Sequence, residues 1–227
     1  MSTNARDEPA PALAVPALPR LNEPAPQFTA PSTMGDIRLS DFKGRWVVLF
    51  SHPADFTPVC STELMAFARE QEAFTALGTQ LIGLSIDSVY AHIEWLRSLE
   101  RNFSVRIGYP VIADVGARVS TLYGMIHPGA SSTATVRAVF VIDPQQMLRA
   151  MVYYPMTVGR SVAEIKRLVQ ALRTNTEKGL ATPEAWLPGQ PCIVPPPATA
   201  GDAERRVKPD QKSDHQVTDW YFATSKP

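Results

Sequence analysis

The sequence has little cysteine, and this shortage excludes several kinds of site. Its 227 residues include only two cysteines, Cys60 and Cys192. Two cysteines so far apart form no disulfide framework, and the lack of a Cys-x-x-Cys pair excludes a thioredoxin-type dithiol. The four scattered histidines and the two cysteines also lack the spacing of a zinc site. We therefore expect neither a metal nor another cofactor.

An excess of charge is also absent. Lys plus Arg and Asp plus Glu each total 22, so the formal net charge is zero. A nucleic-acid binder would normally carry a basic excess, and zero net charge gives no reason to expect binding to an anionic membrane. No apolar run approaches the roughly 20 residues that span a bilayer. The apolar stretch at 11–18 is too short and too proline-broken for a secretion signal, so we expect a cytoplasmic protein.

Proline is abundant, with 21 residues, and it concentrates at the two ends of the chain. Residues 1–26 are rich in Pro and Ala without hydrophobic periodicity, which predicts a disordered or loosely draped extension. Residues 27–176 have a globular composition and form the predicted main domain. Residues 177–227 are proline-rich, then charged, then aromatic. This composition favours a C-terminal arm that wraps the domain surface or another subunit.

Within the main domain, apolar runs of strand length alternate with amphipathic helical patterns. Ser161 stands at the capping-box spacing from Glu164 and is expected to cap a long helix. Strands that alternate with helices, together with one hairpin, predict an α/β domain with three layers. We expect strands at 46–51, 81–86, 110–113, 137–143 and 147–153, and helices at about 58–77, 88–99, 116–123 and 162–172.

The stretch from His52 to Cys60, which reads His-Pro-Ala-Asp-Phe-Thr-Pro-Val-Cys, follows a predicted buried strand and opens a predicted helix. At a helix N-terminus the unpaired N–H groups and the helix dipole favour a thiolate. Lowering a thiol pKa from about 8.5 to about 6 requires roughly 3.4 kcal/mol. A helix terminus supplies only about 0.3–2 kcal/mol. A second source is needed, and an arginine is the natural candidate.

Thr57 and two prolines shape the surroundings of Cys60. Thr57 lies about one helical turn before the cysteine, and its hydroxyl can both donate and accept a hydrogen bond. Pro53 and Pro58 fix the backbone and remove two donors, which favours a rigid pocket. An arbitrary lone cysteine is more often a small buried hydrophobe than a nucleophile. The Pro-x-x-x-Thr-x-x-Cys context favours the nucleophile here.

This stretch resembles the signature of the peroxiredoxin family, and His52 before Pro53 is similar to the 1-Cys branch. The resemblance covers about 27–222 and includes several separate pieces of sequence. It implies a thioredoxin-like fold, in which a central mixed sheet is flanked by helices, followed by a C-terminal dimerisation arm. The matching pieces outside the signature are 84–88, 137–144, 154–160 and 182–186.

The resemblance also implies a peroxide site formed by Pro53, Thr57, Cys60 and Arg137. Cys60 would be the peroxidatic nucleophile, and Thr57 would orient the peroxide. Arg137 would stabilise the thiolate and the charge that develops on the leaving oxygen. Pro53 would shield the sulfur.

Two further residues carry looser roles. His52 is expected to form a hydrogen bond near the thiolate, with a purely structural role in closing the pocket as the alternative. Arg160 is expected to join the arginine network, with a surface position beside a helix as the alternative.

The implied function is a thiol peroxidase that reduces hydrogen peroxide and alkyl hydroperoxides through a Cys60 sulfenic acid. An external thiol would recycle Cys60, and the chain would form a homodimer or a ring of dimers. The alternatives are a redox sensor or chaperone-like assembly that uses the same cysteine, and a non-catalytic interaction protein.

Cys192 leaves a second question open. Typical 2-Cys relatives carry a resolving cysteine where this chain has Thr182. Cys192 lies ten residues further on. It is expected to be an inert packed thiol, and an unorthodox resolving cysteine is the alternative.

Overall fold

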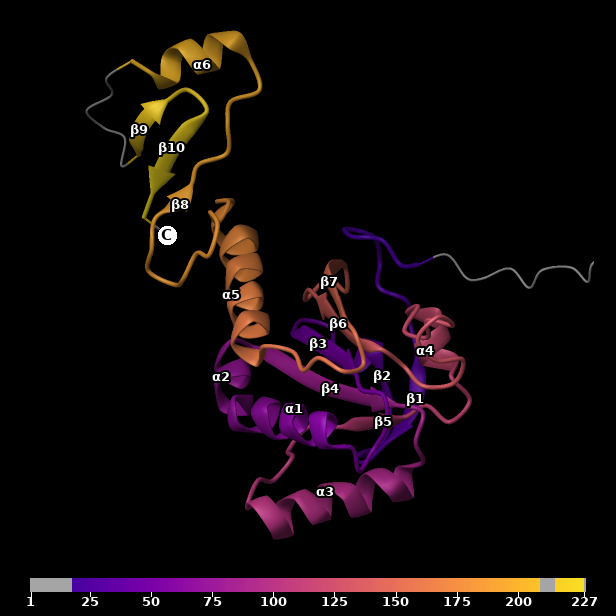
Figure 1. Ribbon diagram of the computed structural model, residues 1–227. Coiled ribbons are helices and arrows are strands. Elements are labelled where there is room, and N and C mark those ends of the chain that lie inside the picture. Colours follow the sequence, from indigo (N-terminus) through magenta and orange to yellow (C-terminus); the bar gives the residue numbers. More distant parts are fainter. Residues whose placement is uncertain (1–17, 209–214, 227) are drawn as a thin grey trace, which may run out of the picture.

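The structure is a computed structural model that describes residues 18–208 and 215–226. Its main body is a seven-stranded sheet with the strand order β2-β1-β5-β4-β3-β6-β7 (Figure 1). The sheet is mixed, because β3 runs parallel to β4 and antiparallel to β6. Its strands are β1 (Thr29–Ser32), β2 (Gly35–Arg38), β3 (Trp46–Ser51), β4 (Thr79–Ser85), β5 (Val111–Ala113), β6 (Arg137–Ile142) and β7 (Leu148–Tyr154).

Helices cover both faces of this sheet. Along β3, Val48 and Phe50 pack into one apolar cluster while Val47 and Leu49 pack into another, as the alternation of a strand requires. The cluster around Phe50 includes side chains of α1 (Pro58–Arg69), α2 (Gln71–Ala76), α3 (Val89–Phe103) and α5 (Val162–Lys178). The cluster around Leu49 includes side chains of the 3-10 helix η1 (Leu39–Phe42) and of α4 (Arg118–Leu122).

The predicted three-layer α/β fold is therefore confirmed. The caps also form, since the Ser88 side chain accepts a hydrogen bond from Ala91 N and the Ser161 side chain accepts one from Glu164 N. Two details differ from the sequence prediction. The helix expected at 58–77 is divided at Glu70 into α1 and α2. The short β1–β2 hairpin was not predicted, because four-residue strands give too little periodicity.

The structure describes only the last part of the predicted N-terminal extension. Residues 1–17 of the expected disordered extension lie outside the described residues. The last part of the extension, from residue 18 on, pairs with the β6–β7 hairpin. Asn22 N donates to Leu148 O, and Ala25 N donates to Gln146 O. These bonds use only backbone atoms, so the side-chain pattern gives no signal of them.

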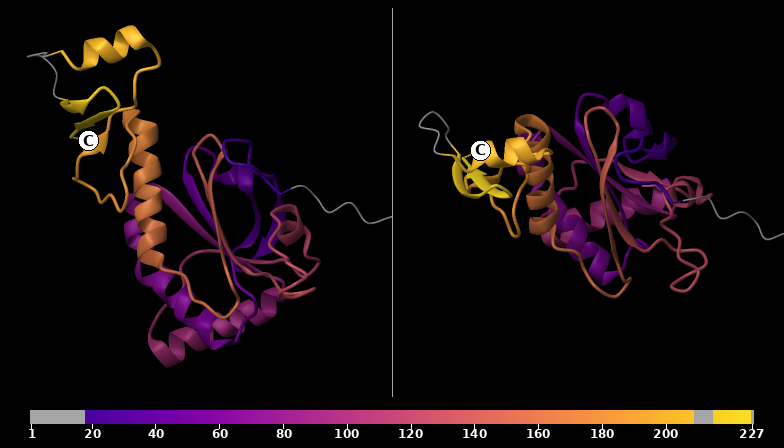
Figure 2. Two further views of the ribbon diagram at one scale, coloured as in Figure 1. Left: turned by 45° about the horizontal axis from the view of Figure 1, so that its top comes forward. Right: turned by 90° about the horizontal axis from the view of Figure 1, so that it is seen from above.

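The C-terminal segment forms a small sheet of its own beyond the end of α5 (Figure 2). It has the order β8-β10-β9, from β8 (Cys192–Ile193), β9 (Gln216–Asp219) and β10 (Phe222–Ser225), and α6 (Ala200–Arg206) accompanies it. The sequence predicted an arm without a core of its own, whereas this segment pairs its own strands. Within the described residues, no helix combines the length and apolarity needed to cross a membrane.

Candidate active site

Cys60 lies in the first turn of α1, as the sequence predicted. Thr57 is the N-cap residue, and Pro58 takes the first helical position, where its fixed φ suits the helix. The loop 52–57 joins the end of β3 to this turn, and within it Phe56 has a left-handed φ of 54°. Such a conformation is costly for a residue with a side chain and is held only by strong local constraints. The Cys60 side chain is completely buried.

Arg137, the first residue of β6, approaches the sulfur directly. Its Nη1 lies 3.4 Å from Cys60 Sγ and donates a 2.6 Å hydrogen bond to Glu63 Oε2. Its Nε and Nη2 both donate to the carbonyl oxygen of Met156, at 2.9 and 2.7 Å. The guanidinium is therefore fixed from two sides, with one edge presented to the sulfur.

Arg160 forms the other half of this arrangement. Its Nε and Nη2 bind the two oxygens of Glu63, both at 2.8 Å, and its backbone N donates to Oε1 at 2.7 Å. Its Nη1 donates to Ser51 O on β3 and to Ala138 O on β6. Arg160 is thus a buried member of the arginine network, and the alternative of a surface position does not hold.

Glu63 is one of the residues that sequence reasoning missed. Burial raises the pKa of its carboxyl, but the hydrogen bonds and charge of Arg160, followed by the charge of Arg137, outweigh burial and hold that pKa below its ordinary value. Two guanidiniums around one carboxylate leave a net positive charge beside the sulfur. The available signal was a glutamate three residues after Cys60, next to the core residue Leu64 on the same helix.

Thr57 and Pro53 lie in the same loop. The Thr57 hydroxyl donates to Ala54 O at 2.9 Å, so its lone pairs remain available to accept a hydrogen bond. Pro53 is buried. The structure brings Cys60 and Arg137 into contact, and it places Thr57 one turn before the sulfur without a hydrogen bond to it among the described residues.

His52 binds Asp55 rather than Cys60. Its Nε2 lies 2.9 Å from Asp55 Oδ1, and the other oxygen of Asp55 lies 2.7 Å from His92 Nδ1. His92 Nε2 donates to Ile112 O at 3.0 Å. The expected hydrogen bond of His52 near the thiolate thus stays a prediction, and Asp55 and His92 are partners that the sequence did not indicate.

His52, Asp55 and His92 are also the group among the described residues whose ligand atoms could surround a metal ion, since these atoms lie within 4.8 Å of one another. Both oxygens of Asp55 already face a histidine ring nitrogen at hydrogen-bond distance. These contacts favour a hydrogen-bonded cluster over a metal site.

Cys192 belongs to a different environment. It lies on β8 and packs with Ala171 and Trp186 in a small apolar cluster. Burial raises the pKa of the Cys192 thiol, although a hydrogen bond with Trp186 opposes the shift. A buried thiol of this kind is a poor nucleophile, which favours the inert interpretation.

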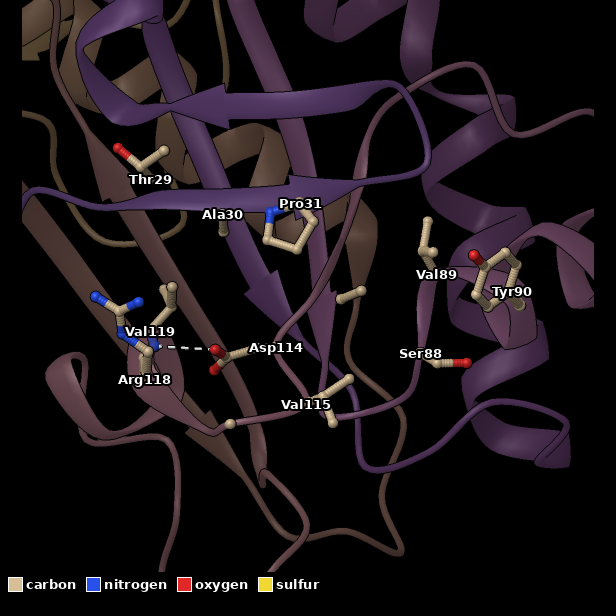
Figure 3. Close-up of a pocket in the computed structure, with 12 residues that line it drawn as sticks. Thr29, Ala30, Pro31, Ser88, Val89, Tyr90, Asp114, Val115, Arg118 and Val119 are labelled. Carbon is tan, nitrogen blue, oxygen red and sulfur yellow. Dashed lines mark hydrogen bonds between the residues drawn. The ribbon is translucent and has the colours of Figure 1, made fainter.

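A groove of about 400 Å³ lies between β1, the start of α3 and the β5–α4 segment (Figure 3). None of the expected peroxide-site residues lines it. Asp114 on its wall accepts hydrogen bonds from Val119 N and Ser120 N, so this carboxylate serves to cap α4. The groove is separate from the cysteine site.

The comparisons with known proteins agree with this geometry. Residues 21–151 match the AhpC/TSA family, and residues 171–208 match the C-terminal domain of 1-Cys peroxiredoxin. A peroxiredoxin of Aquifex aeolicus is 49% identical over 221 residues, which covers 92% of this chain and 98% of that one. A peroxiredoxin of Methanosarcina mazei is 45% identical over 216 residues, with 92% and 98% covered.

Solved structures of peroxiredoxins are also similar to this chain. A yeast mitochondrial 1-Cys peroxiredoxin matches with a TM-score of 0.81 and 36% identity, and the match covers 92% of this chain and 99% of the other. A cysteine-to-serine mutant of peroxiredoxin 6 from Arenicola marina matches at 0.78 and 35%, covering 92% and 98%. The chain belongs to the peroxiredoxin family, and both solved relatives are of the 1-Cys or peroxiredoxin 6 kind. It is a thiol-dependent peroxidase, an oxidoreductase.

The buried carboxylate leads to the first prediction. Glu63→Gln should lower the free energy of unfolding at neutral pH by about 3–5 kcal/mol, because two buried guanidiniums lose their counter-charge. The folded-state pKa of Glu63 is depressed, so its contribution is present above the ordinary pKa and is lost as pH falls through the folded-state value. The variant should therefore lose less stability than the wild type on acidification. Urea unfolding at a series of pH values measures both effects.

The control is Glu94→Gln, which removes an exposed ion pair with Arg101. Exposed pairs contribute little, so this variant should unfold like the wild type. Equal stability of the Glu63 and Glu94 variants at neutral pH would contradict the proposed role of the buried carboxylate.

Proposed function

We propose that this peroxidase reduces hydrogen peroxide and alkyl hydroperoxides at a site made by Cys60, Thr57, Arg137 and Pro53. The observation that carries the proposal is the position of Arg137, whose Nη1 lies 3.4 Å from Cys60 Sγ. The same Nη1 donates to Glu63, and the Met156 carbonyl holds Nε and Nη2. A fixed cation beside a sulfur at a helix N-terminus favours the thiolate, which is the nucleophilic form.

In the first step the Cys60 thiolate attacks the terminal oxygen of the peroxide. A sulfur–oxygen bond forms and the oxygen–oxygen bond breaks, so Cys60 is oxidised to a sulfenic acid. The departing electron pair remains on the leaving oxygen, which takes up a proton to become water or an alcohol. Arg137 stabilises the charge that grows on this oxygen. The Thr57 hydroxyl already donates to Ala54 O, so it accepts the hydrogen bond of the peroxide.

In the second step an external thiol attacks the sulfenic sulfur, which releases water and leaves a mixed disulfide. A second thiol reduces that disulfide and restores Cys60. The yeast relative is described as resolved through glutathione and thioredoxin systems, so we infer that small thiols or dithiol proteins serve here. Cys60 is completely buried, so its loop must open for this step.

Supporting roles follow from the same contacts. Arg160 acts through Glu63, whose two oxygens it binds, and thereby holds Arg137 in place. Pro53 fixes the backbone of the buried loop and shields the sulfur. His52 forms part of the pocket wall. The same cysteine would serve a redox sensor or chaperone-like assembly, but the family match favours catalytic turnover.

We further propose that the chain acts in the cytoplasm, in cell redox homeostasis, as a homodimer or a ring of dimers. Both cysteines are free thiols, as is usual in a reducing compartment. The C-terminal segment exposes three consecutive aromatic residues, Trp220, Tyr221 and Phe222. Clustered exposed aromatics are typical of interface residues. The proposed chemistry needs no nucleic acid, membrane, metal or other cofactor.

One equivalent of hydrogen peroxide should raise the mass of the reduced chain by a single oxygen, because Cys60 has no resolving partner nearby. Cys60→Ser should abolish this change, and Cys192→Ala should leave it intact. Intact mass spectrometry under non-reducing conditions distinguishes the outcomes. A disulfide between Cys60 and Cys192, within or between chains, would instead assign Cys192 as the resolving cysteine.

Arg137→Met should slow the oxidation of Cys60 by roughly 10²–10³-fold, the usual cost of removing one donor that stabilises a developing oxyanion. Arg137→Lys keeps the positive charge but lacks the planar guanidinium with its fixed donors, so it should recover part of the rate. Stopped-flow kinetics with hydrogen peroxide measures both. Arg101→Met, which removes an exposed arginine, is the matched control and should react at the wild-type rate. A wild-type rate for Arg137→Met would refute the assignment of Arg137.

The chain should sediment as a dimer or larger species at micromolar concentration, because the exposed aromatics of the C-terminal sheet would be covered by a second copy. Combining Trp220→Asp with Phe222→Asp should shift the population toward monomer. Phe103→Asp, at a similarly exposed aromatic of α3, is the control and should leave assembly unchanged. Analytical ultracentrifugation is the measurement, and a monomer that persists at every concentration would rule out the proposal.

A further inference from the structure

The cluster of His52, Asp55 and His92 is the most deeply buried set of titratable groups outside the arginine network. Both imidazole rings have no exposed surface, and Asp55 retains only 7%. His52 and Asp55 belong to the loop that precedes Cys60, whereas His92 comes from α3. The cluster therefore ties the active-site loop to α3, whose Trp95 also packs against the rings of His52 and Phe56.

The hydrogen bonds determine where the protons are. The carbonyl oxygen of Ile112 only accepts, so His92 Nε2, at 3.0 Å, carries a hydrogen. An ionised carboxylate also only accepts, so both ring nitrogens that face Asp55 carry hydrogens as well. Burial raises the pKa of Asp55, but the hydrogen bonds and charges of the two histidines reverse this and lower it. With Asp55 ionised, the contacts to Asp55 and to Ile112 O give both ring nitrogens of His92 the role of donors.

His52 then has one defined neutral form. Its Nε2 carries the hydrogen that Asp55 accepts, and its Nδ1 is buried without a hydrogen-bond partner among the residues that the structure describes. A proton at Nδ1 would create a second imidazolium against a single carboxylate. Burial foremost lowers the pKa of His52, and the charges of His92 and Arg160 act in the same direction, against the raising effect of Asp55. His52 therefore presents a bare Nδ1 lone pair.

We propose that His92 is a positioning residue of the peroxide site, which keeps Asp55 ionised and, through Asp55, holds His52 neutral with its proton on Nε2. The proposal rests on the proposed function only in assigning the 52–57 loop to the peroxide site. The protonation states follow from the hydrogen-bond geometry taken with the lowered pKa of Asp55 and of His52.

The hydrogen bonds of Asp55 hold the part of the loop that carries Thr57. Asp55 binds both histidines through its side chain, and its backbone N donates to Asp87 Oδ2 at 3.0 Å. The next residue, Phe56, holds the left-handed conformation, and Thr57 follows it. The charged or titratable groups that interact with Asp55 or His52 are Asp87, Arg160 and the two histidines themselves. If Asp55 were displaced, Thr57 would move with the loop. His52 would also gain a proton, which would add a positive charge to the wall of the peroxide site.

His92→Asn tests the charge apart from the geometry. The asparagine amide can still donate to Asp55, but it brings no positive charge. The carboxylate of Asp55 would then act on His52 alone, so the pKa of His52 should rise and Nδ1 should take up a proton more readily as the pH falls. His92→Phe, which removes both the donor and the charge, should show the same change together with a larger loss of stability.

The decisive measurement is the two-bond proton–nitrogen NMR spectrum of the ring nitrogens in the reduced full-length chain. The exposed His127 and His215 are removed by substitution with Gln to leave two signals. At pH 7 the wild-type pattern should show one ring with hydrogens on both nitrogens and one neutral ring protonated on Nε2. In His92→Asn the remaining ring should titrate. A neutral His92 at pH 7, an unchanged His52 in the variant, or a spectrum altered by EDTA would overturn the proposal.

Kinetics then connects the cluster to the reaction. The rate of Cys60 oxidation in His92→Asn should fall roughly tenfold to a hundredfold at acidic pH and recover above the titration of His52. A loss of equal size at every pH would mean a merely structural role and would overturn the proposal. Because the spectra need no peroxide, the failure of the proposed peroxide chemistry would leave the protonation assignment standing and would be recognised separately.

Discussion

The carboxylate of Glu63 is the interaction on which the remainder of the site depends. Burying an ion costs several kcal/mol, and this cost is offset only when every partner is in place. Here the two oxygens of Glu63 receive hydrogen bonds from Arg137 and from both the side chain and backbone of Arg160. Arg160 also binds carbonyl oxygens of β3 and β6. The charged cluster thus joins α1 to the two central strands and, since Cys60 lies one turn before Glu63, fixes the sulfur against Arg137.

This rigidity conflicts with turnover. A peroxide is small enough for a narrow opening, whereas a thiol reductant must bring its own sulfur to a cysteine that has no exposed surface. The segment that would have to open is the loop before α1, in which Phe56 is both strained and exposed. The hydrogen bonds of Asp55 hold this loop to His92 of α3 and to Asp87.

The sequence predicted the parts of the molecule that depend on local patterns. The apolar runs of β3 and β6, the serine caps of α3 and α5, and the position of Cys60 at a helix start all follow from neighbouring residues. Arg137 came from the family resemblance, because 77 positions separate it from Cys60. The pairing of β8 with β10 joins residues 192–193 to residues 224–225, which no local pattern indicates.

Glu63, Asp55 and His92 escaped prediction for a related physical reason. Each is a polar residue whose importance arises from complete burial against partners that are distant in sequence, such as the 37 positions between Asp55 and His92. On a helix pattern alone, glutamate and histidine are ordinary surface residues. Only the fold distinguishes a buried ion from an exposed one.

The two buried clusters beside the active-site loop differ in how they respond to pH. The Glu63 cluster is built from guanidiniums, which keep their charge in proteins, and from a carboxylate whose depressed pKa keeps it ionised near neutrality. The net charge of the Glu63 cluster is therefore constant near neutral pH. The Asp55 cluster contains two imidazoles, so its charge depends on the hydrogen bonds and partners that hold each ring in one protonation state. Loss of the His92 partner would therefore let a pH dependence enter the peroxide site through His52, whereas the Glu63 cluster offers no such route.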